Sequence, residues 1–152
     1  MSWVAGRRSM AELLAARPSL AALVGPLRRD ARAGAPGRSA ALITARVEQI
    51  VNGHGTLDGF GTLSDGEQVV LAVTEQFLLD AHAIDDSMIG ALSQHYSPAD
   101  LVAIMFHLAL VDGFTKFNRV FDAQPEIEPE TEIEIEVDVG VGVNVPLGKD
   151  VS

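Results

Sequence analysis

Eleven consecutive residues, Leu101 to Val111 (LVAIMFHLALV), include a single polar side chain, that of His107. A helix that crosses a bilayer needs about 20 apolar residues, so a run of about half that length indicates a core helix. Ser97 and Pro98 stand just before it, and both residue types favour the start of a helix. We therefore expect a helix from about Pro98 to Asp122, the most buried element of a mainly α-helical body, and no membrane partner.

Apolar spacing or capping residues predict helices in four earlier stretches. These stretches are residues 9–24, 39–52, 64–82 and 86–94. The first stretch is one or two short helices, with Pro18 as a break or a new first turn, and Gly25-Pro26 is expected to end it, because proline removes a backbone donor. The Ala-, Gly- and Pro-rich residues 30–38 are expected to form a linker. Ser64 and Glu67 have the spacing of a capping box. Residues 54–62 contain three glycines and no period of either kind, which predicts a loop.

After Pro125 the pattern changes from helical to alternating. Seven β-branched residues occupy every second position from Ile133 to Val145, with Glu, Asp, Gly or Asn between them. Such alternation predicts a β-strand with one apolar face, which needs a partner: the arm of a second subunit, a hairpin or another protein. The alternative is a disordered acidic tail. The chain is thus divided into a helical segment and linker (1–37), a helical domain (38–125) and an acidic β-forming arm (126–152).

The charges are divided between the two ends of a chain whose net charge is -10. Residues 1–46 carry eight Arg against two acids, and residues 126–138 carry seven acids and no base. The arginines are scattered without interleaved aromatic residues, so nucleic acid is not an expected partner. The N-terminal residues lack the apolar run of a signal peptide, which favours a cytoplasmic location.

Residues 92–126 (LSQHYSPADLVAIMFHLALVDGFTKFNRVFDAQPE) join a short helix, a Ser start, an apolar helix and an ending in Phe117-Asn118-Arg119 before Pro125-Glu126. In these features the segment resembles the C-terminal helices of the carboxymuconolactone decarboxylase and alkylhydroperoxidase D superfamily. Residues 63–92 resemble the family helix that precedes them, so the likeness covers about half of the chain. It implies an alkylhydroperoxidase D-like helical bundle that assembles as a homo-oligomer, a trimer or a hexamer.

Residues 41–54 (ALITARVEQIVNGH) are similar to the family helix that leads into Asn-Gly-Cys-x-x-Cys-x-x-x-His, with Glu48 and Asn52-Gly53 in place. His54 stands where the first cysteine would be, and the glycine-rich loop replaces the second cysteine and the histidine. The chain has no Cys. Disulfides, thiolate metal sites and thiol peroxidase chemistry are therefore excluded, because each needs a sulfur atom.

Acid–base work by histidine and carboxylate is the chemistry that remains, because the sequence has no metal-ligand spacing, nucleophile elbow or phosphate loop. Glu48 and His54 lie six residues apart across a helix end, where the carboxylate could orient the imidazole; the structural interpretation of His54 is an exposed loop histidine. His107 must be hydrogen-bonded or face a cavity, because an unpartnered buried imidazole is costly. Glu48, His54 and His107 are the candidate catalytic residues, and neither a cofactor nor a metal is expected.

Three functions remain open at this point. The first is a cofactor-independent, carboxymuconolactone decarboxylase-like enzyme. It would catalyse proton transfer, decarboxylation or isomerisation of a small cyclic or unsaturated acid. The second is a non-catalytic helical scaffold that is assembled through the C-terminal arm. The third is a peptide precursor whose helical body is a recognition domain and whose Val- and Gly-rich C-terminus is modified.

Overall fold

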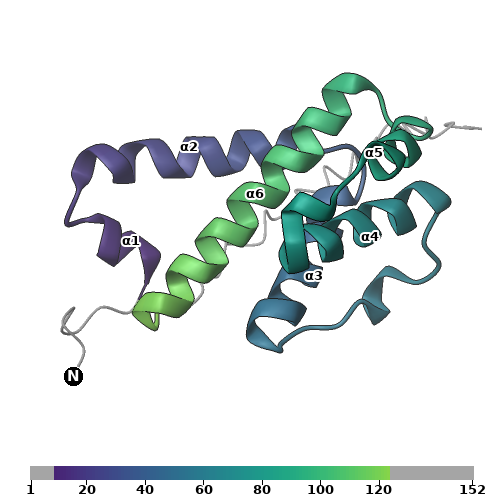
Figure 1. Ribbon diagram of the computed structural model, residues 1–152. Helices are drawn as coiled ribbons and strands as arrows, with labels where there is room; N and C mark the ends of the chain where they lie inside the picture. Colours follow the sequence, from purple (N-terminus) through teal and green to yellow (C-terminus); the bar gives the residue numbers. More distant parts are fainter. Residues whose placement is uncertain (1–8, 124–152) are drawn as a thin grey trace, which may run out of the picture.

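A computed structural model of the chain describes residues 9–123, and the arm at 126–152, with its expected strand, lies outside the described residues. The described part consists of helices and their connections (Figure 1). Its α-helices are α1 (Met10–Leu14), α2 (Pro18–Gly34), α3 (Ser39–Asn52), α4 (Asp65–Asp80), α5 (Asp86–Ser93) and α6 (Pro98–Phe121), with 3-10 turns at Asp58–Phe60 and Ala81–Ala83. No strand occurs within residues 9–123, so a mainly α-helical body is confirmed.

Helix α3 packs against both α4 and α6 (Figure 1). Two ion pairs connect it to α4 in the same order along both helices: Arg38 meets Glu67, and Arg46 meets Glu75. This order shows that α3 and α4 run in the same direction. The chain must therefore travel back along α3, through residues 53–64, before α4 can begin.

Seven buried side chains from α3, α4, α5 and α6 form the hydrophobic core. They are Ile43, Val47, Val70, Val73, Leu92, Ile104 and Leu108. Fully burying an aliphatic side chain of this size stabilises the folded state by about 1.5–3 kcal/mol relative to leaving it exposed. Because these residues come from four helices, the core holds α3 against its neighbours on both sides.

The expectation that α6 is the most buried helix is wrong. Helix α3 buries five of its 14 residues, whereas α6 buries four of 24. One side of α6 meets the core, and the side chains of Val102, Phe106 and Val120 are exposed to 70 %, 47 % and 78 %. By length and composition alone α6 could cross a membrane, but core helices of soluble proteins pass the same test.

Helix α2 also differs from the expectation, because it continues through Gly25-Pro26 to Gly34. Proline inside a helix costs about 3 kcal/mol, but most of the residues that follow it are Leu, Ala and Arg, which are among the strongest helix formers. Packing adds to this local preference: Ala31 is 6 % exposed, and a Cβ atom on Gly34 would lie 3.5 Å from the Cβ atom of Ala103 on α6. The first half of the expected linker, residues 30–38, is therefore packed helix.

The predicted end of α3 and the predicted start of α4 are confirmed. Gly53 ends α3 in the left-handed conformation with φ 70°. At the start of α4 the Ser64 hydroxyl accepts from the Glu67 N–H at 3.2 Å, and a Glu67 carboxylate oxygen accepts from the Ser64 N–H at 2.8 Å. This capping box satisfies amides that would otherwise lack partners in the first turn.

Arg38 fixes the end of the returning connection. Its Nε donates to one carboxylate oxygen of Glu67 and its Nη2 donates to the other, both at 2.8 Å. Its Nη1 donates to the carbonyl oxygen of Phe60 at 2.7 Å, and the guanidinium lies 5.8 Å from the centroid of the Phe60 ring. The hydrogen bonds from Arg38 and from the backbone of Ser64 lower the pKa of Glu67 from 4.5 to about 2.

This lowered pKa predicts a loss of stability in acid. Because Glu67 binds a proton more weakly in the folded chain than in the unfolded one, its contribution is complete above pH 4.5 and is lost as the pH falls through about 2. Urea midpoints measured across this range should fall with pH in the wild type. The fall should be smaller in Arg38→Met and in Glu67→Gln, and an unchanged fall in Glu67→Gln would contradict this assignment.

Candidate functional site

His107 lies on the side of α6 that meets α3, and it is 5 % exposed. Its Nε2 is 3.2 Å from the carbonyl oxygen of Ala40 and 3.3 Å from the hydroxyl oxygen of Thr44. A carbonyl oxygen only accepts, so this contact requires the proton on Nε2. The Thr44 hydroxyl donates its own proton to the carbonyl oxygen of Ala40 at 2.9 Å. Its oxygen keeps lone pairs that can accept from His107 Nε2. The imidazole of His107 is thus hydrogen-bonded between two helices.

Glu48 lies farther along the same contact between α3 and α6. One carboxylate oxygen accepts from the side-chain amide of Asn52 at 2.6 Å, and the other lies 3.5 Å from the hydroxyl of Thr115 on α6. One turn later, the Arg119 guanidinium of α6 donates to the carbonyl oxygen of Val51. These contacts follow the same order in both helices, so α6, like α4, runs parallel to α3.

His54 lies away from this contact, in the connection that follows α3. Its side chain is exposed, and Gly53 has already turned the chain out of the helix. The carboxylate that was expected to orient it, Glu48, is instead engaged by Asn52 and Thr115. The structure therefore does not join His54 and Glu48 into a carboxylate–imidazole pair.

Glu48 and His107 do not share a position either. The partner of Glu48 on α6 is Thr115, eight residues after His107, and eight residues span about 12 Å along a helix. General acid–base catalysis needs its groups within hydrogen-bonding reach of one substrate. Glu48 and His107 lie at separate turns of the contact between α3 and α6, about 12 Å apart along the helix.

Two of the hollows on the described surface are formed by described residues alone, and none of the three candidates lines either of these two. The larger, about 460 Å³, lies between α4 and α5 and is lined by Asp65, Gln68, Val69, Ala72, Val73, Ser87, Met88 and Ala91. The smaller, about 260 Å³, lies between α2 and α6. Within residues 9–123, no group of three or more His, Asp and Glu side chains could hold a metal ion.

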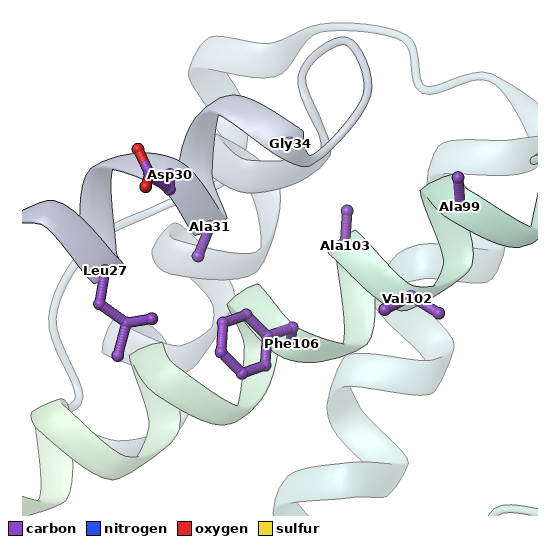
Figure 2. Close-up of a pocket in the computed structure, with 8 residues that line it drawn as sticks. All are labelled: Leu27, Asp30, Ala31, Gly34, Ala99, Val102, Ala103 and Phe106. Atoms are coloured by element: carbon purple, nitrogen blue, oxygen red, sulfur yellow. The ribbon is translucent and has the colours of Figure 1, made fainter.

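The smaller hollow is a groove with an apolar floor (Figure 2). It is lined by Leu27, Asp30, Ala31, Gly34, Ala99, Val102, Ala103 and Phe106. Its one charged residue, Asp30, points its carboxylate away from α6 (Figure 2). The groove therefore offers apolar contact and almost no polar recognition.

Large apolar side chains extend this groove along α2. Leu20 and Leu23 precede Leu27 by seven and four residues, a spacing that places all three on one side of a helix. Together with Val102 and Phe106 they form what we call the α2–α6 face. Their exposed fractions are 50 % for Leu20, 65 % for Leu23, 39 % for Leu27, 70 % for Val102 and 47 % for Phe106. Surfaces of this kind on folded chains mark sites of association.

Reasoning from the sequence did not identify this face. The leucines at positions 20, 23 and 27 carry the signal, since their spacing is that of one helical side. Gly25-Pro26 conceals this signal, because the pair predicts the end of a helix and so places Leu27 in a different element.

Comparisons of the chain with protein-family models, with curated proteins and with solved structures found no match.

The hydrogen bond between Thr44 and His107 can be tested with a double-mutant cycle. Thr44→Val and His107→Leu should each destabilise the chain, and their effects should be non-additive by about 0.5–1.5 kcal/mol, the net value of one hydrogen bond. Urea unfolding of the wild type, both single variants and the double variant measures this coupling. Thr74→Val is a matched control, because the buried Thr74 hydroxyl bonds within α4, so its effect should add to that of His107→Leu. Additive effects in the Thr44 cycle would contradict the assignment.

Proposed function

We propose that the chain is a non-catalytic helical scaffold that acts through its α2–α6 face. A contrast between two sets of residues carries this proposal. Glu48 and His107 are engaged between α3 and α6, and His54 lies apart from both. The α2–α6 face, by comparison, exposes five large apolar side chains around a groove with an apolar floor.

Chemistry supports the same division. An acid or base must reach a substrate atom directly or through one water, and Glu48, His54 and His107 line neither of the two hollows described above. Exposing apolar side chains has no benefit for folding, because burial is what stabilises them. Five such side chains on one face are therefore explained by contact with another molecule.

The proposed scaffold is a cytoplasmic homo-oligomer, and the acidic arm at 126–152 provides a second contact beyond the α2–α6 face. A decarboxylase-like reaction in an alkylhydroperoxidase D-like bundle, and a modified C-terminus, stay predictions. The same experiment separates all three functions, because each assigns the essential residues to a different part of the chain.

That experiment is complementation of a strain from which the gene has been deleted. Glu48→Gln and His54→Gln remove the ionisable groups and should complement fully. Leu23→Glu and Val102→Glu place a charge on the α2–α6 face and should fail. Leu79→Glu is the matched control, since the parent side chain is 78 % exposed and lies on α4, which does not contribute to the face, and it should complement.

Circular dichroism must show the same helical signal for all five variants, so that a loss of function is not a loss of fold. Failure of Glu48→Gln or His54→Gln, with normal function of both face variants, would overturn the scaffold and favour the enzyme. Failure of a truncation before residue 132 alone would favour the role of a modified C-terminus.

A further inference from the structure

The side of α2 that carries the α2–α6 face has a symmetric spacing. Its residues, at positions 20, 23, 27, 31 and 34, are separated by steps of three, four, four and three. Such a series is the same in both directions. Two copies of α2 placed antiparallel about Leu27 would therefore bring every residue of the series opposite a residue of the same series.

The side chains along this series are complementary in size. The first half is large, with Leu20 and Leu23 exposed to 50 % and 65 %. The second half is small, with Ala31 and Gly34 lining the groove. In the antiparallel arrangement Leu20 of one copy lies opposite Gly34 of the other, and Leu23 lies opposite Ala31. The protruding side chains of each copy therefore enter the groove of the other, beside Val102 and Phe106, as knobs enter holes.

The extent of the face is also appropriate for a second copy. With about 200 Å² for each large apolar side chain, the exposed fractions on this face leave roughly 500 Å² of apolar surface. A specific interface buries about 800 Å² on each partner, including its polar rim. The one charged residue of the groove, Asp30, points away from α6 (Figure 2), so two copies of a chain with net charge -10 can meet here with little repulsion.

We propose that a second copy of this chain docks on the α2–α6 face through an antiparallel α2–α2 contact centred on Leu27. This inference rests on the proposed function and names the partner of the face. The contact is isologous, because each copy contributes the same knobs and the same groove.

Site-specific cross-linking tests the register without interference, because the natural chain has no Cys. Leu27→Cys lies on the two-fold axis, so mild oxidation should convert most of the chain into a disulfide-linked dimer. Leu20→Cys lies on the same face, but in this register it faces Gly34 of the second copy. The cysteine of that copy, at position 20, is 14 residues from Gly34, or about 21 Å along the helix. A disulfide needs Cα atoms within about 7 Å, so Leu20→Cys should not cross-link, and neither should the exposed control Leu79→Cys.

Sedimentation equilibrium tests the contact without a cross-link. Leu23→Glu should raise the dissociation constant of the dimer at least about tenfold, whereas Leu79→Glu should leave it unchanged.

A monomeric wild type at high concentration would overturn this inference, as would equal cross-linking of Leu20→Cys and Leu27→Cys. The scaffold proposal would survive either result if Leu23→Glu still failed to complement, because the face would then bind another protein. The scaffold proposal would be wrong if Leu23→Glu and Val102→Glu both complemented, whatever the cross-linking result.

Discussion

Helix α3 lies between two helices that run in its own direction, and the course of the rest of the chain depends on this arrangement. Helices joined by a short turn are antiparallel neighbours, so a parallel pair needs a connection that returns along the first helix. Between α3 and α4 that connection is residues 53–64. Arg38, at the start of α3, binds Phe60 in the connection and Glu67 in the first turn of α4. One guanidinium therefore joins the starts of both helices to the end of the loop between them.

Much of the helical body could be predicted because helix starts carry their own chemical signal. Ser64, Asp85 and Ser97 each place a side-chain oxygen where the first turn needs an acceptor, and such residues are preferred there in any fold. The course of α2 could not be predicted in the same way. Gly25-Pro26 disfavours a helix locally, and the packing of Ala31 and Gly34 on α6 is a contact between distant parts of the chain.

The candidate site could be predicted only in part, for a similar reason. The sequence showed that His107 needs a partner, because the residues around it are apolar. It could not show that the partner is the backbone carbonyl of Ala40, since every residue has a carbonyl. His54 and Glu48 are near one another in the chain, but Gly53 directs the loop away from the helix, and nearness in sequence did not become contact.

The polar contacts between α3 and α6 have a role that apolar packing does not supply. If α6 moved along α3 by one turn, about 5.4 Å, aliphatic side chains could pack again with other aliphatic neighbours. His107, Thr115 and Arg119 would then all lose their partners on α3 together. Leaving a buried polar group unpaired costs about 1–3 kcal/mol. His107 and Thr115 are buried, so their contacts above all select one register of the two helices. An ionisable residue in an apolar helix is therefore explained here by the alignment of that helix, and its presence alone is weak support for catalysis.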